Sequence, residues 1–268
     1  MSKFRHILNL SGGKDSTALA LYMRDKIPNM EYIFCDTGEE LDETYEYLYQ
    51  IEAYLGKKII RLNDRAGFDH WLKVFGGYLP GPRMRWCTKI LKLKPFEKYI
   101  GDESIISYVG IRADENRLGY ISGKDTIKTV FPFKDANIDY DGVIKILQDS
   151  GIGLPPYMQW GRTHSGCYFC FFQQKIEWVR LLENYPEKYD KAQSFEKISS
   201  KMGKTFTWIE GMPLQELRKP ENIEHIKLKH KQNLKKLDQK RGNKKLVEIL
   251  AGREEEEYRY RACLICQL

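Results

Sequence analysis

The sequence predicts an α/β fold in which a mostly parallel, doubly wound sheet carries helices on both faces. Two observations support this. Apolar runs typical of buried strands alternate with segments of helical period, and a Gly-Gly turn directly follows the first apolar run. The chain of 268 residues is 42% hydrophobic, which is enough to bury a sizeable core. We expect one α/β domain over residues 1–165 and a helical, cysteine-containing region over residues 166–268.

The strand and helix signals alternate along the first part of the chain. Strands are predicted over residues 5–10, 31–36, 58–62 and 105–111, and helices over residues 16–24 and 41–55. In the second helix, apolar side chains recur at steps of three and four until Gly56, a residue that commonly ends helices. The same spacing near the end of the chain predicts an amphipathic helix with lysines on its other face. Its apolar-face positions are Ile223, Ile226, His230, Leu234 and Leu237.

The turn after the first strand is predicted to bind phosphate. It has the sequence Ser11-Gly12-Gly13-Lys14-Asp15-Ser16 and leads directly into a helix. The two glycines let backbone N–H groups approach phosphate oxygens, and the helix start adds further N–H groups and the positive end of its dipole. Lys14 contributes a point charge, and the two serines contribute hydroxyl donors. The spacing does not fit the GxxxxGK[ST] loop, so transfer of a γ-phosphate is not indicated.

The positive charge of the chain lies in one C-terminal segment. The formal net charge is +7, whereas residues 227–245 hold nine Lys or Arg and one acid, Asp238; this local +8 leaves −1 for the rest. Such a concentration favours contacts with nucleic-acid phosphates, although a solvated lysine-rich helix face has the same composition. No apolar run approaches a membrane span and no signal-peptide core is present, so no membrane contact and a cytoplasmic location are expected.

Several segments together resemble a known family. The Ser11–Ser16 loop resembles the PP-loop of ATP pyrophosphatases, which adenylate a substrate and release pyrophosphate. Further segments resemble the phosphoadenosine-phosphosulfate (PAPS) reductase-like branch of these enzymes. They are Tyr32 to Gly38, Arg85-Trp86-Cys87, Gly110-Ile111-Arg112, Pro155-Pro156-Tyr157 and Gly166-Cys167-Tyr168-Phe169-Cys170. The resemblance covers about residues 5–190 and implies a PP-loop, adenine nucleotide alpha hydrolase-like fold.

The resemblance implies ATP as the cofactor and a set of site residues. Catalytic roles fall on Lys14, Asp15, Ser16 and Asp36. Nucleotide contacts fall on Ser11, Gly12, Gly13, Lys14, Asp15, Ser16, Thr37, Gly110, Arg112 and Arg117. Arginines suit bidentate phosphate contacts, and Asp15 and Asp36 are candidates to hold Mg²⁺, although an Asp at a strand end is often only a cap. PAPS reductases carry a degenerate loop, so the intact loop here favours cleavage of ATP at the α-phosphate.

The cysteines form a second group of candidate ligands. They are Cys87 and two Cys-x2-Cys pairs, Cys167 with Cys170 and Cys263 with Cys266. The resemblance places the first three together, and a tail cysteine would complete a [4Fe–4S] cluster, because Trp86 stands where iron–sulfur reductases have a further cysteine. The alternatives are a four-thiolate Zn²⁺ site from the two pairs, a tail pair that carries a mobile thiol or persulfide, and small buried thiols. Cys35, inside a strand, is expected in the core.

The favoured function is an ATP pyrophosphatase that adenylates a substrate, yielding AMP and pyrophosphate, before sulfur replaces the activated oxygen. The chain most resembles the small ATP pyrophosphatase of DNA phosphorothioation systems, which implies DNA as the favoured nucleic acid, a cysteine desulfurase as sulfur donor and a role in defence against phage. The alternatives are an assimilatory reductase of adenylyl sulfate or PAPS, a tRNA thiolation enzyme and a non-catalytic nucleotide-binding subunit. The oligomeric state, including a homo-oligomer, stays open.

Overall fold

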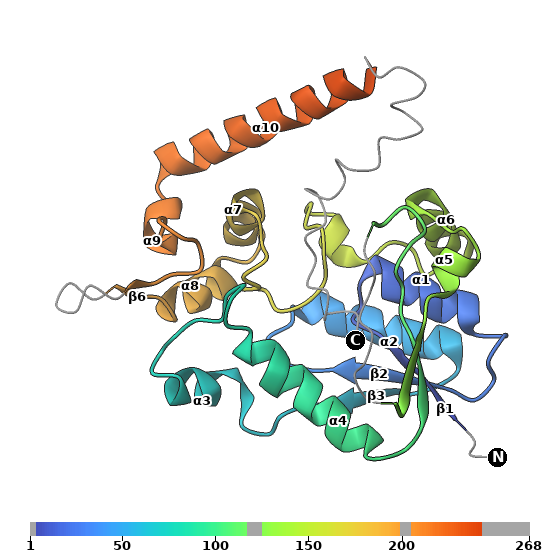
Figure 1. Ribbon diagram of the computed structural model, residues 1–268. Helices are drawn as coiled ribbons and strands as arrows, with labels where there is room; N and C mark the ends of the chain where they lie inside the picture. The colour runs from blue at the N-terminus through green and yellow to red at the C-terminus, as the bar shows by residue number, and fades with distance from the viewer. Residues whose placement is uncertain (1–3, 117–124, 199–204, 243–268) are drawn as a thin grey trace.

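A five-stranded parallel sheet forms the centre of the first part of the chain (Figure 1). The computed structural model describes residues 4–116, 125–198 and 205–242. The strands are β1 (Arg5–Asn9), β2 (Met30–Cys35), β3 (Ile59–Leu62), β4 (Ile105–Tyr108) and β5 (Ile127–Val130), in the order β3-β2-β1-β4-β5. Every neighbouring pair is parallel, so all five carboxyl ends meet at one edge of the sheet.

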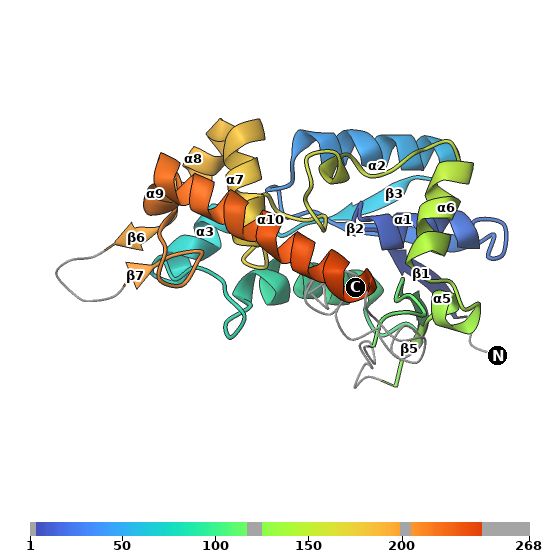
Figure 2. The same ribbon diagram turned by 90° about the horizontal axis from the view of Figure 1, so that it is seen from above.

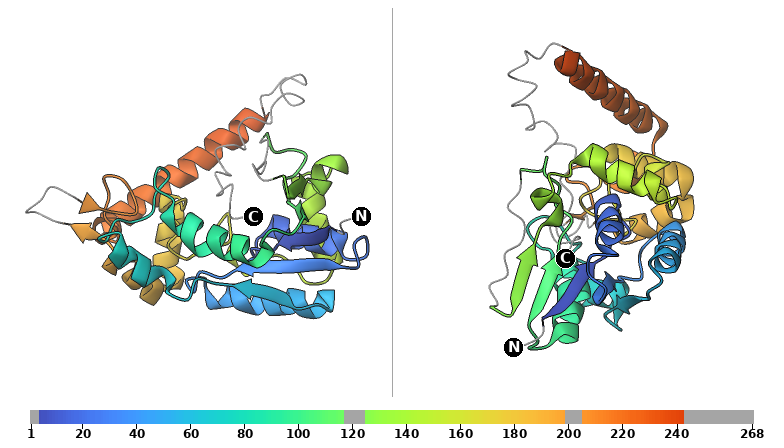
Figure 3. Two further views of the ribbon diagram at one scale, coloured as in Figure 1. Left: turned by 60° about the horizontal axis from the view of Figure 1, so that its bottom comes forward. Right: turned by 90° about the vertical axis from the view of Figure 1, so that its right-hand side faces the viewer.

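Helices cover both faces of this sheet (Figure 3), because alternate residues of each strand point to opposite sides. In β1, Leu8 packs with helices α1 (Lys14–Met23), α2 (Asp42–Leu55) and α6 (Tyr140–Asp149). Ile7 packs on the other face with Phe96 and Ile100 of α4 (Lys94–Ile100). Strands buried on both faces read as continuous apolar runs, which is the pattern in the sequence. The predicted doubly wound α/β fold is therefore confirmed.

The C-terminal region is mainly helical, with an aromatic core. Its elements are α7 (Lys175–Asn184), α8 (Pro186–Ser194), β6 (Lys197–Ile198), β7 (Thr205–Phe206), α9 (Leu214–Leu217) and α10 (Pro220–Gly242). The antiparallel β6–β7 pair was not predicted. Side chains of the first part join this core: Phe68 of α3 (Gly67–Val74) lies 4.5 Å, between ring centroids, from Phe169. The division near residue 165 stays a prediction, since one hydrophobic cluster includes residues from both sides of it.

Some elements of the first part also differ from the prediction. Strand β4 ends at Tyr108 rather than residue 111. Strand β5 and the helices α3, α4, α5 (Pro132–Asp135) and α6 were not predicted. Two irregular helices complete the described part, the π-helix η1 (Thr88–Leu93) and the 3₁₀ turn η2 (Pro156–Met158). Among the described residues, no helix is both long enough and apolar enough to cross a membrane.

Candidate active site

The glycine-rich loop lies between the carboxyl end of β1 and the start of α1, as predicted. Gly12 has a φ of +70°, a backbone conformation that favours glycine, and Gly13 is the N-cap of α1. The Ser16 hydroxyl donates to the Gly13 carbonyl oxygen at 3.1 Å and lies 3.1 Å from the Ser11 hydroxyl oxygen. The first N–H groups of a helix have no partner within the helix, so the start of α1 can receive an anion.

Two other segments approach the loop closely enough to require glycine at the contact. A Cβ on Gly110 would lie 2.9 Å from the backbone oxygen of Asp15, and a Cβ on Gly13 would lie 2.8 Å from Ser165 Oγ. Ser165 also donates a hydrogen bond of 3.2 Å to Ser11 Oγ. The loop is thus held between the segment after β4 and the segment that precedes the central cysteine pair.

A chain of buried charges begins in the loop. Lys14 Nζ lies 2.6 Å from Asp15 Oδ2, and Arg112 Nη1 lies 3.1 Å from Asp15 Oδ1. The same guanidinium reaches Asp114 at 3.0 Å and Glu115 at 3.3 Å. Lys14 is 3% exposed and Arg112 is 1% exposed. The prediction that Arg112 contacts phosphate remains untested, and its position shows that it orients Asp15.

The charges of Lys14 and Arg112 set the ionisation of Asp15. Burial acts to raise the pKa of Asp15, but the ammonium of Lys14 and the guanidinium of Arg112 outweigh burial and hold this pKa below its usual value. Asp15 is therefore ionised near neutral pH, and both of its oxygens already have cationic partners. Asp36, the other Mg²⁺ candidate, accepts hydrogen bonds from Tyr45 Oη at 2.8 Å and from the Gly38 N–H at 2.9 Å. Asp36 thus caps the turn after β2, and its Mg²⁺ role stays a prediction.

Side chains far along the chain contact the loop or the segment that packs on it, and the sequence analysis gave them no role. Tyr157 Oη accepts a hydrogen bond of 3.1 Å from the Lys14 N–H, and burial raises the pKa of this phenol. Arg162 donates to the carbonyl oxygens of Gly166 and Cys167 at 3.0 and 2.6 Å. Burial lowers the pKa of His164 to about 4, so this imidazole is neutral at pH 7. Tyr157, Gly166 and Cys167 lie in segments that the resemblance had marked; Arg162, His164 and Ser165 do not.

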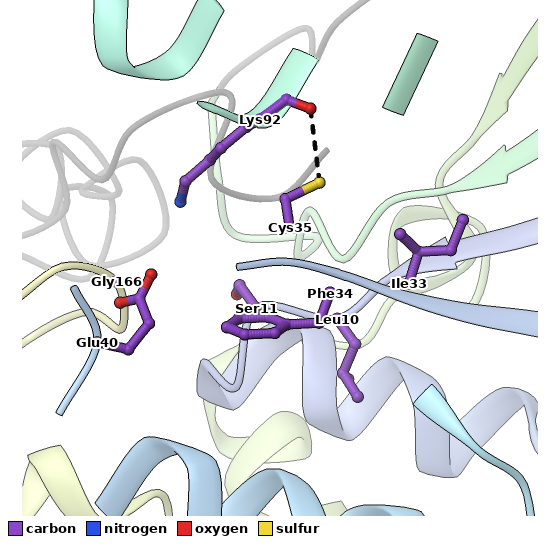
Figure 4. A pocket seen from close by; sticks show the side chains of 8 residues that line it. All are labelled: Leu10, Ser11, Ile33, Phe34, Cys35, Glu40, Lys92 and Gly166. Atoms are coloured by element: carbon purple, nitrogen blue, oxygen red, sulfur yellow. Dashed lines mark hydrogen bonds between the residues drawn. The ribbon is translucent and has the colours of Figure 1, made fainter. Parts of the chain in front are cut away.

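A pocket opens beside the loop at the carboxyl ends of β1 and β2 (Figure 4). Its lining residues are Leu10, Ser11, Ile33, Phe34, Cys35, Glu40, Lys92 and Gly166. Glu40 is 3% exposed, and its Oε1 accepts a hydrogen bond of 3.0 Å from Thr37 Oγ1, while Oε2 has no hydrogen-bond partner. Burial raises the pKa of Glu40, and the nearby Lys92 opposes this rise. One side of the pocket is therefore apolar, and the other carries an acid and an amine.

Cys167 lies close to this pocket, and the described cysteines are not grouped as a metal site. Cys167 Sγ is 3.1 Å from Thr37 Oγ1 and 3.9 Å from Glu40 Oε1, and burial and the Glu40 carboxylate raise the pKa of its thiol. Cys87 is the N-cap of η1. In the part of the chain that the structure describes, no three His, Cys, Asp or Glu side chains are grouped as a metal ion requires. Cys170 belongs to the same segment as Cys167, and the predicted centre, which includes a tail cysteine, stays a prediction.

Trp86 has a structural role at the position where the resemblance would place a cysteine. Its indole is 3% exposed, stacks on Phe68 and Phe75 with centroid distances of 5.0 and 5.1 Å, and donates to the Tyr78 carbonyl oxygen at 3.0 Å. Cys35 is 8% exposed, and burial raises the pKa of its thiol to about 11, which confirms the expected core position. Arg117, Cys263 and Cys266 lie outside the described residues, so their predicted roles remain untested.

Metal content gives a direct test of the predicted centre. If Cys87, Cys167 and Cys170 bind one centre with a tail cysteine, Cys167→Ser is expected to lose most of the bound iron or zinc, because thiolates dominate such sites. Cys35→Ser is the matched control, since that thiol lies in the sheet. Elemental analysis and an absorption spectrum of anaerobically purified protein provide the measurement. Equal metal content in wild-type protein and Cys167→Ser would contradict the predicted centre.

The comparison with known proteins gives a family match. Residues 5–171, more than half of the chain, match the phosphoadenosine phosphosulfate reductase domain family. The chain belongs to this family. The solved structure of phosphoadenylyl-sulfate (PAPS) reductase from Candida auris in a phosphate complex superposes with a TM-score of 0.49 and 16% identity. The superposition covers 61% of this chain and 81% of that one.

Relatives in sequence are uncharacterized proteins. Two come from Methanocaldococcus jannaschii: one is 29% identical over 195 residues and the other 25% identical over 199 residues, each over 68% of this chain. These stretches make up 39% and 45% of the two proteins, so the chain spans less than half the length of either. A third, from Escherichia phage 186, is 23% identical over 253 residues and is covered over 75% of its length.

Proposed function

We propose that this protein is an ATP pyrophosphatase that transfers AMP to an acceptor and releases pyrophosphate, as the activating step of a sulfur transfer. The observation that carries the proposal is the intact loop, whose Lys14 is held by a buried ion pair with Asp15 and, through Asp15, by Arg112. A preorganised cation at the start of α1 lies where it could stabilise the charge that develops on a leaving pyrophosphate. Membership in the PAPS reductase domain family supports an enzyme of nucleotide-dependent sulfur chemistry.

The residues of the loop region have separate roles in this reaction. The start of α1 and the Ser11 and Ser16 hydroxyls bind the phosphates of ATP, while the apolar side of the pocket receives the adenosine. An acceptor oxygen attacks the α-phosphorus, the bond between this phosphorus and the bridging oxygen breaks, and pyrophosphate leaves with the electron pair. Lys14 offsets the charge that develops on the leaving group. Mg²⁺ bound with the nucleotide would neutralise part of the phosphate charge.

The acceptor is proposed to be nucleic acid, with DNA favoured, as in DNA phosphorothioation. A persulfide from a donor such as a cysteine desulfurase would then attack the acceptor phosphorus that carries the activated oxygen, and AMP would leave with that oxygen. A second thiol would cleave the remaining S–S bond and leave the sulfur on the acceptor. The support is the basic helix α10, whose described lysine side chains are exposed. The main alternative, reduction of adenylyl sulfate or PAPS, is supported by the family itself. In that case the protein needs no cleavage of ATP.

Product analysis separates these alternatives. Incubation with ATP labelled at the α-phosphate is expected to give labelled AMP and an equal amount of pyrophosphate, most readily with an acceptor present. Formation of ADP and inorganic phosphate would show that the loop does not position the α-phosphate for attack. Sulfite from adenylyl sulfate or PAPS and a thiol reductant, with no AMP formed from ATP, would favour the reductase. Absence of both activities, together with tight ATP binding, would indicate a nucleotide-binding subunit.

A further inference from the structure

Among the described residues, the contacts that link helix α10 to the rest of the protein lie on one side of the helix. The helix has 23 residues; it begins beside α9 and runs above the other helices in Figure 1, and the view from above in Figure 2 shows it passing over other elements. Ile226, 8% exposed, belongs to the aromatic core region, and Ile223 packs against the same cluster. Lys227 forms an ion pair with Glu183 of α7, and Arg180 of α7 lies 3.5 Å from His230. These contacts fix which face of α10 points to solvent.

The outward face carries two rows of lysine with an uncharged strip between them. At about 100° per residue, Lys231 and Lys235 are four residues apart and share one side, whereas Lys229 and Lys236 are seven apart and share the other. Leu228 and Gln232 lie between the rows, opposite the side that packs on α7. All six side chains are exposed, and Leu228 is 56% exposed. The acids Glu221 and Glu224 lie in the turns of α10 before this face, so they do not offset the charge of its lysines.

We propose that α10 lies in the major groove of duplex DNA, with one lysine row on the phosphates of each strand and Leu228 and Gln232 toward the base edges. A helix with its side chains is about 10–12 Å across, and the major groove of B-DNA is about 12 Å wide. Glutamine can pair with adenine, and an apolar side chain can contact the thymine methyl group. The major groove of an RNA duplex is too deep and narrow for such a helix. The inference rests on the proposed function only in taking the acceptor to be nucleic acid.

The supports of α10 lead back to the candidate active site. Helix α7, on which α10 packs, begins with a capping box in which Glu177 takes part. Glu177 Oε1 accepts hydrogen bonds from the N–H and the hydroxyl of Thr163, at 2.7 and 2.8 Å. Two residues later Ser165 contacts the Ser11 hydroxyl. The segment that supports α10 through α7 therefore also contacts the phosphate-binding loop.

Binding without ATP tests the lysine rows. Fluorescence anisotropy with a labelled DNA duplex is measured across a salt series for wild type, for Lys231→Glu with Lys235→Glu, and for Lys229→Glu with Lys236→Glu. The slope of log affinity against log salt is negative, and each double variant is expected to make it about 1.8 less steep. Each lost phosphate contact on duplex DNA removes about 0.9 from the size of this slope. The matched control, Lys73→Glu with Lys145→Glu, changes exposed lysines of α3 and α6 by the same charge and should bind as wild type. If a row variant binds like this control, the proposal is overturned.

Substrate comparisons test the groove itself. A DNA duplex whose cytosines carry a neutral, bulky 5-substituent fills the major groove, and we expect it to bind at least about tenfold more weakly than the plain duplex, as the loss of a base contact would predict. A minor-groove ligand such as distamycin should change the affinity little. Equal affinity for the substituted duplex, or for an RNA duplex of the same sequence, would overturn groove insertion. AMP release from ATP without DNA is measured separately, so a failed pyrophosphatase and a failed DNA contact give different results.

Discussion

Replacing Lys14 with alanine is expected to lower the rate of AMP and pyrophosphate formation about 100- to 1,000-fold, the usual effect of removing one preorganised charge or donor from a reacting oxyanion. The ammonium lies in the loop at the start of α1, 2.6 Å from Asp15 Oδ2 and 5.5 Å from the centroid of the Tyr140 ring. These neighbours fix its position before ATP arrives. The variant should fold, because Arg112 still balances the Asp15 charge.

Lys26→Ala is the matched control for this experiment. Lys26 follows the far end of α1, is exposed, and lies over the Tyr22 ring, well away from the loop. Single-turnover formation of AMP at saturating ATP measures the chemical step, and thermal unfolding of both variants checks the fold. A folded Lys14→Ala protein that forms AMP at the wild-type rate would remove Lys14 from the proposed mechanism. A slow Lys26→Ala protein would show that the effect is not specific to the loop.

The elements predicted well from the sequence are those whose determinants are local. Helix α2 was predicted over residues 41–55 and spans Asp42–Leu55, with Gly56 in the left-handed conformation at a φ of +63° as its C-cap. The strand–loop–helix order around Gly12 and Gly13 depends on adjacent residues in the same way. The order β3-β2-β1-β4-β5 was not predicted, because right-handed crossovers limit the possible strand orders without selecting one, and β5 was missed.

The features that were missed depend on distant partners or on weak local signals. Ser165 meets Ser11 across 154 residues, and Tyr157 meets Lys14 across 143, so no local pattern indicates either contact. Strand β5 is a half-exposed edge strand of four residues that includes Lys128, and its apolar signal is correspondingly weak. From the sequence, Trp86 is recognisable only as a tryptophan at a position where the resembled family has a cysteine. That it completes an aromatic stack is evident only once Phe68 and Phe75 lie beside it.

Arg112 gives the largest expected effect on stability. Its side chain is almost fully buried, and it binds Asp15, Asp114 and Glu115, so Arg112→Ala would leave three carboxylates without their shared cation. Breaking a buried charge cluster in this way is expected to lower the free energy of unfolding by about 3–5 kcal/mol at pH 7. Arg112→Lys keeps the charge but loses the fork that reaches Asp15 and Asp114 together, so it should recover only part of the loss. The control Arg24→Ala removes an exposed partner of Asp25 and should cost less than about 1 kcal/mol.

The pH dependence of unfolding shows whether lost charge interactions or lost packing lower the free energy of unfolding of Arg112→Ala. Because Lys14 and Arg112 hold the pKa of Asp15 below its unfolded value of about 3.9, the wild-type protein has this stabilisation above that value and loses it as the pH falls. Arg112→Ala removes one of the two cations beside Asp15, so burial raises the pKa of Asp15 in the variant, and protonation of this carboxylate relieves the variant as the pH falls. The difference in unfolding free energy between the two proteins should therefore narrow from pH 7 to pH 4, as followed by urea denaturation. A difference that stays constant over this range would assign the cost to lost packing around the guanidinium, because packing does not titrate.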